Sequence, residues 1–404
     1  MTEKIMILGA GIYQVPLIRK AKEMGLYTIV SSIPGNYPGF AIADQVYYLN
    51  TTDKESILEV CEKERVAGIC TAGTDIAIAT IGYVNHELGL AGITEPAASR
   101  AADKTVMQET FHRGGVSAAK FVKAASLEAV RAAADEIGFP VVVKCVDSSG
   151  SRGISIVEDP DGLEAAFRAA LDVSRKNYVL VEEKLKGTEI GIDGIVQNGE
   201  IIFLAPHQKS VWRNGDTVIT AGHDFPYQCS DALMEDIWRQ TGRAVVALEL
   251  NDCAINLDAF ADGDRLSIIE IGGRSGATCI PELISRCYGF DYYEKILQLA
   301  LGMKVSCDAA EEPVPCRARL MMCPVDGTIT DIDETGLDAI RAEGIDVSLD
   351  HGVGDPVEAM HNGTARIGQV IAGADSEEQM RAIMDRVYRC IRINSVSLES
   401  LWNE

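Results

Sequence analysis

The sequence lacks the features of several common protein classes: long apolar runs, paired cysteines and a surplus of positive charge. Within its 404 residues no stretch approaches the roughly 20 apolar residues that a transmembrane helix needs. The first residues lead straight into an apolar strand, without the basic segment and cleavage site of a signal peptide. We therefore expect a cytoplasmic protein without a membrane partner.

Cysteine and histidine occur, but not in the patterns that form disulfide frameworks or bind zinc. The eleven cysteines include no Cys-x-x-Cys pair, so we expect reduced and mostly buried thiols. The six histidines include neither His-x-His nor His-Glu-x-x-His, which disfavours zinc. With 60 acidic and 37 basic residues the net charge is -23, which argues against a nucleic-acid partner. An anionic ligand must then be held by a local cluster of cations and backbone amides.

The first hundred residues alternate apolar strands with helical stretches. Strands at 5–8, 27–31 and 68–71, separated by helices, predict a parallel sheet covered on both faces. The turn Gly9-Ala10-Gly11 after the first strand resembles a dinucleotide-binding turn, but Gln14 stands where the third glycine belongs. The second strand also ends in serines and not in an acidic ribose ligand. A Rossmann-like scaffold that does not bind NAD is the better interpretation.

Beyond residue 100 the pattern changes to short strands that carry helices, which is typical of an α+β arrangement. An acidic, proline-containing stretch at 307–315 predicts a linker, and the strands and last helix beyond it predict a small β-rich domain. The fold class is therefore α/β followed by α+β. We expect domains at 1–98, 99–306 and 307–404.

Three segments carry residues suited to nucleotide chemistry. In the first, Lys144 ends an apolar strand and precedes the loop Ser148-Ser-Gly-Ser-Arg-Gly153. Small residues let backbone amides approach phosphate oxygens, and the lysine adds a positive charge. A flexible hairpin with a solvated lysine explains the local sequence equally well.

In the second segment Glu182, Glu183 and Glu189 follow a buried strand, where carboxylates could accept hydrogen bonds from an adenine amine and ribose hydroxyls. Exposed glutamates at a strand end are the alternative. In the third segment the turn Asp262-Gly-Asp264 predicts a hairpin that places Asp258 opposite Glu270.

Facing carboxylates repel unless a cation lies between them, and Mg²⁺ suits such oxygen ligands. Arg274, four residues beyond Glu270, is placed to neutralise a phosphoryl group. A surface carboxylate pair is the alternative, but the neighbouring isoleucines favour burial.

In this order and spacing the segments resemble the ATP-grasp superfamily over nearly the whole chain. Asp103-Lys104-x-x-Met107 resembles the start of its two-lobed nucleotide-binding domain, and Gly138-Phe-Pro-Val-Val-Val-Lys144 its phosphate-covering strand. The flanking domains resemble the biotin carboxylase layout, and Gly222-His223-Asp-Phe-Pro226 is most similar to L-amino-acid ligases and related carboxylate–amine ligases.

The resemblance implies that ATP is bound by Lys104, Lys144, Ser149, Gly150, Ser151, Gly153, Glu182, Glu183, Leu185 and Glu189. It implies that Asp258 and Glu270 bind Mg²⁺, and that Lys144 and Arg274 act in phosphoryl transfer to a small carboxylate. An amine would then attack the acyl phosphate, with release of ADP. The implied partners are small carboxylate and amine substrates, and a homodimer is compatible with the sequence.

Two positions depart from the family pattern. Gly272 replaces the asparagine of Glu-x-Asn-Pro-Arg, which puts a second Mg²⁺ in doubt. Thr278 stands where biotin-dependent carboxylases carry a bicarbonate-activating glutamate, so an organic acid is the better substrate. Candidate residues for the acceptor site are His207, Lys209, Arg213 and His223. The alternatives are a purine-pathway ligase or carboxylase and a non-catalytic ATP-binding sensor.

Overall fold

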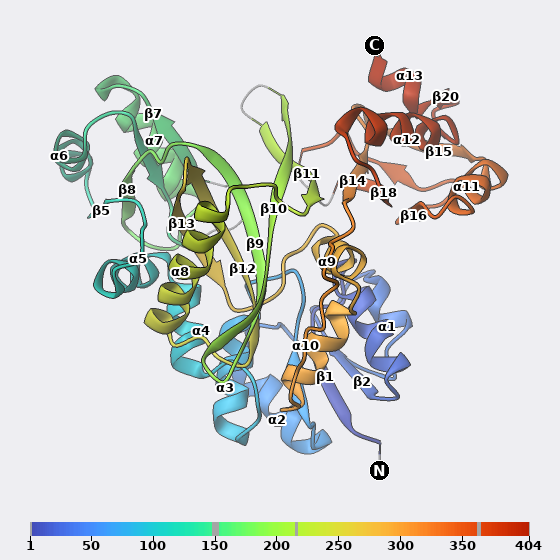
Figure 1. The fold of residues 1–404 in the computed structure, drawn as a ribbon, viewed down its shortest axis with the longest axis horizontal. Coiled ribbons are helices and arrows are strands. Elements are labelled where there is room, and N and C mark those ends of the chain that lie inside the picture. The colour runs from blue at the N-terminus through green and yellow to red at the C-terminus, as the bar shows by residue number, and fades with distance from the viewer. Residues whose placement is uncertain (1, 148–152, 215–216, 362–364, 404) are drawn as a thin grey trace.

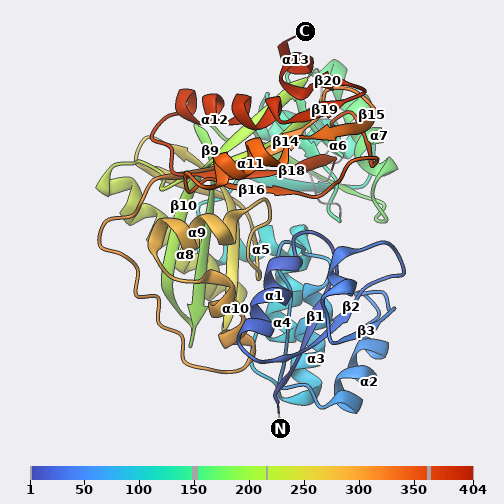
Figure 2. The ribbon, with the colours of Figure 1, turned by 90° about the vertical axis from the view of Figure 1, so that its right-hand side faces the viewer.

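The structure is a computed structural model that describes residues 2–147, 153–214, 217–361 and 365–403. It opens with a four-stranded parallel sheet in the order β3-β2-β1-β4. The elements are β1 (Lys4–Leu8), α1 (Val15–Glu23), β2 (Tyr27–Ser31), η1 (Pro38–Ala41), β3 (Gln45–Tyr47), α2 (Lys54–Glu64), β4 (Gly68–Cys70), α3 (Ile78–Leu88) and α4 (Glu95–Ala102). This region lies at the bottom of both ribbon views (Figures 1 and 2).

The side chain of Gln14 occupies the glycine turn that follows β1. Its buried side-chain oxygen accepts a hydrogen bond from the backbone N–H of Gly11 at 2.9 Å, and its amide donates to the carbonyl of Ala72 at 2.6 Å. The side chain therefore fills the turn and ties it to the loop that follows β4.

A small lobe follows, with the antiparallel sheet β5-β8-β6-β7 covered by helices. Its elements are α5 (Lys104–Gly114), β5 (Phe121–Ala124), α6 (Leu127–Ile137), β6 (Val141–Lys144), β7 (Ile154–Val157), η2 (Pro160–Gly162), α7 (Leu163–Asp172) and β8 (Val179–Glu183). Asp103 caps α5, because its side chain accepts from the backbone N–H groups of Thr105 and Val106. The sheet and helices α6 and α7 form a hydrophobic core of their own.

The central sheet has eight strands in the order β13-β12-β9-β10-β11-β14-β18-β16. Its first part contains β9 (Thr188–Gln197), β10 (Glu200–Asn214), β11 (Thr217–Phe225), α8 (Asp231–Leu248), β12 (Cys253–Asp262), β13 (Arg265–Gly272), α9 (Ile280–Tyr288) and α10 (Tyr292–Ala300). These long strands run through the middle of the molecule (Figure 1). Two hydrophobic clusters join this sheet to the N-terminal sheet, so the two share a core.

The C-terminal part contains β14 (Cys316–Met322), β15 (Gly327–Ile332), α11 (Glu334–Arg341), β16 (Asp346–Leu349), β17 (Pro356–Val357), β18 (Arg366–Ala372), α12 (Glu377–Arg389), β19 (Ile391–Ile393), β20 (Val396–Ser397) and α13 (Leu398–Asn403). Strands β17, β15, β19 and β20 form a second small sheet. The cores of this part and of the small lobe both lie at the end of the molecule opposite the N-terminus (Figures 1 and 2).

The predicted fold class is confirmed, and most strands lie where the sequence predicts them. The central sheet differs in one respect: β11 pairs with β14, so it continues across the predicted boundary at 306/307. The residue limits of the three domains stay a prediction. Within the described residues no cysteine forms a disulfide, and no helix is long and apolar enough to span a membrane.

Candidate functional site

The hairpin β12–β13 brings Asp258 and Glu270 together as predicted, because the two residues are direct partners in the register. Alternate residues of the hairpin, among them Leu257, Ala259 and Ile271, are buried in the core. Side chains alternate between the faces of a strand, so the two carboxylates lie on the opposite face from that core.

Each carboxylate contacts a lysine from another element. Lys104, at the start of α5, lies 3.0 Å from Glu270, and Lys209 of β10 lies 2.5 Å from Asp258. Lys209 also contacts Glu189 at 2.8 Å, which brings a predicted acceptor residue against a predicted ribose ligand. Five residues that the sequence assigned to phosphate, ribose, metal and acceptor therefore form one cluster.

The two carboxyl groups titrate in opposite directions. Burial raises the pKa of Asp258, and the charge of Glu270 adds to this, against Lys209. Burial acts in the same sense on Glu270, but Lys104 outweighs it and lowers the pKa of that carboxyl. A cation between them would relieve the repulsion.

The donor set fits Mg²⁺, which takes six oxygen ligands and is usually held by one or two carboxylates with phosphates and water. No group of three or more His, Cys, Asp or Glu side chains in the described part of the chain is arranged to hold a metal alone. Asp258 and Glu270 would thus provide two ligands and leave the others to the nucleotide.

Lys144 and Glu182, which the sequence analysis assigned to separate parts of ATP, contact each other at 2.7 Å. They lie on the adjacent strands β6 and β8, and their side chains are only 5% and 7% exposed. The Oε1 atom of Glu182 is buried and has no hydrogen-bond partner within the described residues. An N–H donor from a ligand, such as an adenine amine, would satisfy it.

Of the remaining predicted nucleotide residues, Glu183 and Leu185 lie where the chain passes from the lobe to the central sheet, and Gly153 lies directly before β7 in the lobe. Glu183 ends β8 and Leu185 is half-buried in the short connection to β9. Gly153 has a φ of +68°, and a Cβ there would lie 2.3 Å from Val173, so only glycine fits. Ser149, Gly150 and Ser151 lie outside the described residues.

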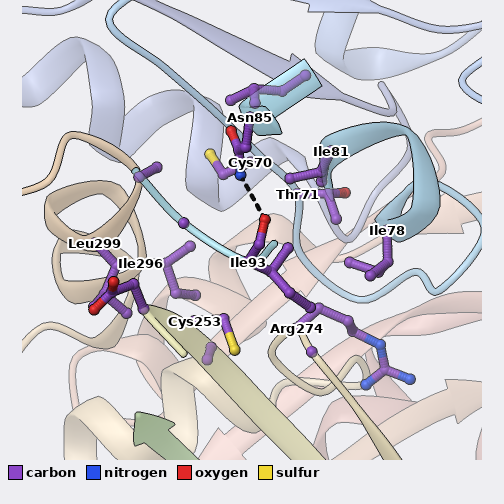
Figure 3. A pocket seen from close by; sticks show the side chains of 16 residues that line it. Cys70, Thr71, Ile78, Ile81, Asn85, Ile93, Cys253, Arg274, Ile296 and Leu299 are labelled. Carbon is purple, nitrogen blue, oxygen red and sulfur yellow. Dashed lines mark hydrogen bonds between the residues drawn. The ribbon is translucent and has the colours of Figure 1, made fainter. Parts of the chain in front are cut away.

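Arg274 is held on several sides. Its Nη1 donates to Asn256 Oδ1 at 2.5 Å and to the carbonyl of Ser275 at 3.1 Å, and its Nη2 donates to Asp75 at 2.7 Å. Behind it lies a cavity of about 40 Å³, too small for a nucleotide. Figure 3 shows Arg274 at the edge of this cavity, with the guanidinium directed away from Cys70 and Ile93.

A buried network that the sequence analysis missed supports the loop of residues 274–279, which follows β13. Asp193 on β9 accepts from the N–H of Gly276 at 2.7 Å and from Asn256 at 2.8 Å, and it lies 3.3 Å from His207 Nε2. His207 in turn lies 3.1 Å from His223. One signal in the sequence could have indicated this network: Asp193 is a carboxylate in the apolar middle of β9.

The structure places both predicted acceptor histidines in this network. His207 and His223 are buried inside the sheet, with exposed fractions of 0% and 3%, which disfavours a direct contact with substrate. Burial, together with the nearby His207, lowers the pKa of His223 well below its usual range. Lys209 belongs to the carboxylate cluster, where it contacts Asp258 and Glu189, and the side chain of Arg213 lies outside the described part of the structure.

A second cavity of about 250 Å³ lies beside the loop of residues 274–279. Its walls come from the N-terminal turn, residues 276–282 and the C-terminal part. Its polar lining residues include Tyr13, Arg19, Thr278, Glu282, Asp350, Arg366 and Gln369. Arg366 contacts Asp350 at 2.6 Å and Gln369 at 2.9 Å. Burial raises the pKa of Glu282.

The backbone of the lining loop is strained. Thr278 and Cys279 are consecutive residues with φ of +54° and +66°, a region that non-glycine residues rarely adopt. Such strain is typical of sites where the backbone is constrained by function. The loop of residues 274–279 therefore joins the carboxylate cluster to the larger cavity.

Comparison with known proteins agrees with this arrangement. A family model described as "Carbamoyl-phosphate synthase L chain, ATP binding domain" matches residues 103–307, and one described as "L-amino acid ligase C-terminal domain 2" matches residues 319–395. A formate-dependent phosphoribosylglycinamide formyltransferase of Parasynechococcus marenigrum (strain WH8102) is 27% identical, covering 96% of this chain and 97% of the relative.

Two solved structures superpose over 97% of this chain. The phosphoribosylglycinamide synthetase from Anaerococcus prevotii has a TM-score of 0.81 at 25% identity and is covered to 99%. The L-amino acid ligase from Bacillus licheniformis has a TM-score of 0.78 at 18% identity and is covered to 98%, which shows a shared fold alone. The resemblance inferred from the motifs is confirmed.

Proposed function

Because the chain belongs to the family of the carbamoyl-phosphate synthase L chain ATP-binding domain, we propose that it is an ADP-forming ligase that activates a small carboxylate as an acyl phosphate and transfers the acyl group to an amine. The chain is an ATP-grasp enzyme, with ATP and Mg²⁺ as cofactors. The observation that carries the proposal is the loop of residues 274–279. It places Arg274 close enough to Glu270 of the carboxylate cluster for the arginine charge to act on the pKa of that carboxyl, and it lines the 250 Å³ cavity a few residues later.

The residues of the cluster have complementary tasks in this reaction. Lys104 and Lys144 would exchange their carboxylate partners for phosphate oxygens, and Glu182 Oε1 would accept from the adenine amine. Asp258 and Glu270 would hold Mg²⁺, which neutralises phosphate charge when it is bound. Arg274 is anchored in place before the phosphoryl group arrives, so it needs little reorganisation during transfer.

The larger cavity would hold the amine. Glu282 offers a carboxylate to a protonated amine, and its Oε2 is buried without a hydrogen-bond partner within the described residues. Arg366 and Arg19 offer positive charge to an anionic part of the same molecule. An acceptor with both an amine and an anionic group suits this lining.

Two classes of acceptor fit that description. The formyltransferase that aligns over 96% of the chain supports a purine-pathway ligase, with formate as the acid and phosphoribosylglycinamide as the amine, better than it supports an amino-acid ligase. An amino acid as acceptor is the second candidate. The match of residues 319–395 favours this candidate. The ion pair of Arg366 with Asp350 also favours it, because the pair leaves less positive charge for a phosphate group than for the single charge of an amino-acid carboxylate.

ADP release with pairs of acids and amines at saturating Mg-ATP tests these proposals. Formate with phosphoribosylglycinamide is compared with a panel of amino acids, alone and in pairs. Turnover with the ribonucleotide supports the purine-pathway reaction, and turnover with amino-acid pairs supports the second candidate. AMP and pyrophosphate as products, or ADP release that needs only bicarbonate, would refute a carboxylate–amine ligase.

A further inference from the structure

Gly272, the last residue of β13, leaves space beside the guanidinium of Arg274. A Cβ at this position would lie 3.6 Å from Arg274 Nε and 3.7 Å from its Cζ, so a side chain there would touch the guanidinium. The same Cβ would lie 2.8 Å from Oδ1 of Asp75. The space is therefore taken by a carboxylate that comes from a segment almost two hundred residues away.

The loop that carries Asp75 is fixed from both sides. It follows β4 of the N-terminal sheet, and Gln14 holds it through the carbonyl of Ala72. Gly73 donates its N–H to the carbonyl of Ser275 at 3.3 Å, and a Cβ on Gly73 would lie 3.2 Å from Cβ of Ala277, so the two loops pack closely. Because the N-terminal and central sheets share a core, the carboxylate is held by a rigid part of the molecule.

The side chain of Asp75 holds Arg274 and remains partly open to solvent. Its Oδ2 accepts from Arg274 Nη2 at 2.7 Å, and its side chain is 48% exposed. The charge of Asp75 also reaches Lys104, the partner of Glu270. Asp75 thus lies near the residues that would bind phosphate.

We propose that Asp75 is a positioning residue for phosphoryl transfer, which holds the Arg274 guanidinium from the N-terminal domain in the space that Gly272 leaves open. This inference rests on the proposed function. Asp75 acts through Arg274 and is not assigned a contact with the reacting atoms. Its loss should therefore weaken binding of the transferring phosphoryl group and leave binding of the nucleotide itself unchanged.

The test measures binding and needs no identified substrate acid. The affinity for MgADP is compared with the affinity for MgADP plus aluminium fluoride, which mimics a phosphoryl group in transfer. Asp75→Ala should reduce the gain in affinity on adding fluoride by about tenfold or more, the effect of a lost charge-assisted contact. Its affinity for MgADP alone should stay within about twofold of wild type.

A transplant of the carboxylate separates positioning from a general structural role. Gly272→Asp alone should reduce the fluoride gain, because two carboxylates then compete for one space. The double variant Asp75→Ala with Gly272→Asp should recover most of the gain, since Asp at 272 reaches Arg274 directly. Asp75→Asn provides a shape-preserving variant if Asp75→Ala does not fold, and it should show a smaller loss.

Glu249→Ala is the matched control. Like Asp75, Glu249 forms an ion pair with an arginine from a distant segment, since it contacts Arg100 at 3.0 Å. This pair is not part of the carboxylate cluster. Glu249→Ala should leave the fluoride gain unchanged. A full gain in both Asp75 variants, or no recovery in the double variant, would overturn the role of Asp75. Absence of any fluoride gain in the wild type would instead overturn the proposed phosphoryl transfer, and this inference with it.

Discussion

At the scale of single residues, the ion pair of Lys144 and Glu182 makes two separable predictions. Lys144→Met leaves the buried Glu182 without its partner, so the free energy of unfolding should fall by about 3–5 kcal/mol. The double variant with Glu182→Gln should restore most of this stability, because no buried charge is left unpaired. Both variants should lose at least about 2 kcal/mol of ATP binding.

Urea unfolding and titration with ATP measure the two effects on the same samples. A single variant that loses stability but binds ATP normally would show that Lys144 serves only the fold. Normal ATP affinity in the stable double variant would remove both residues from the nucleotide site.

Glu282 predicts a dependence of stability on pH. Burial raises its pKa in the folded protein, so the folded state takes up this proton more readily than the unfolded state. The ionised group therefore destabilises the fold at neutral pH, and this penalty disappears as the pH falls through the raised pKa. Glu282→Gln should raise the temperature of unfolding at neutral pH, and the difference should vanish in acid.

The same substitution should raise the KM for the amine, because the cavity loses the charge that faces a cationic group. Glu311→Gln, at an exposed position of the connection before β14, should change neither quantity. A Glu282→Gln protein that is less stable than wild type at neutral pH would show that the ionised carboxylate is favourable in the fold.

At the scale of elements, the sequence pattern correctly predicted features that depend on contacts between residues close together in the chain. The apolar alternation around the Asp262-Gly263-Asp264 turn places Asp258 opposite Glu270, and the register agrees. Asp103 caps the start of α5, a local signal that the sequence analysis did not use. Strand β11 was missed, because His223 and Gly222 interrupt its apolar pattern. It pairs with β10, directly before it, and with β14, almost a hundred residues further along the chain.

The sequence picked out residues that the structure brings together, but not their pairs, and their function stays a prediction. Lys104 and Glu270 form one pair, and Lys209 joins Glu189 to Asp258. Which lysine contacts which carboxylate depends on the packing of α5 and β10 against the hairpin, and no spacing in the sequence encodes it. Asp75 could not be predicted either, since it reaches the site from a different sheet.

Strand β9 makes a prediction about packing. A Cβ at Gly191 would lie 2.1 Å from the buried ring of His207, which is stacked on Phe225. The ring has no room to move, so Gly191→Ala should destabilise the protein by about 3 kcal/mol and loosen the network behind Arg274. Urea unfolding of this variant provides the measurement.

Gly242→Ala is the control on helix α8, where a Cβ meets no atom within 4 Å. It should stabilise the protein by about 0.5–1 kcal/mol, because alanine loses less entropy than glycine in a helix. Equal effects of the two substitutions would contradict the close packing of His207 on Gly191.

At the scale of the whole molecule, the division of the cores decides which parts can move. The N-terminal and central sheets share two hydrophobic clusters, whereas the lobe of residues 121–183 has its own. Arg274 and the wall of the acceptor cavity formed by residues 12–19 and 276–282 are therefore built on this shared core, and the C-terminal part forms the other wall. Lys144 and Glu182 belong to the lobe, which can approach the carboxylate cluster when a nucleotide bridges the two.

This arrangement predicts that acyl-phosphate formation does not need the amine. Phosphate would be held by Lys104 and Lys144 on one side and by Arg274 on the other, while the amine cavity begins only at Gly276. With the right acid, Mg-ATP and hydroxylamine in place of the natural amine, the enzyme should form a hydroxamate and an equal amount of ADP. Colour development with ferric ion and ADP measured in the same sample check the ratio.

Substitutions of Glu282 and of Arg274 should separate the two half-reactions, which are formation of the acyl phosphate and transfer of the acyl group to the amine. Glu282→Gln should leave the hydroxamate yield close to wild type, because hydroxylamine is a small neutral nucleophile that needs no charged anchor in the cavity. Arg274→Ala should lose hydroxamate and ADP together by about a hundredfold or more, the scale found when a preorganised donor to a transition state is removed. ADP without hydroxamate would mean that water reaches the acyl phosphate first, and ADP formation that requires the natural amine would contradict the separation of the two sites.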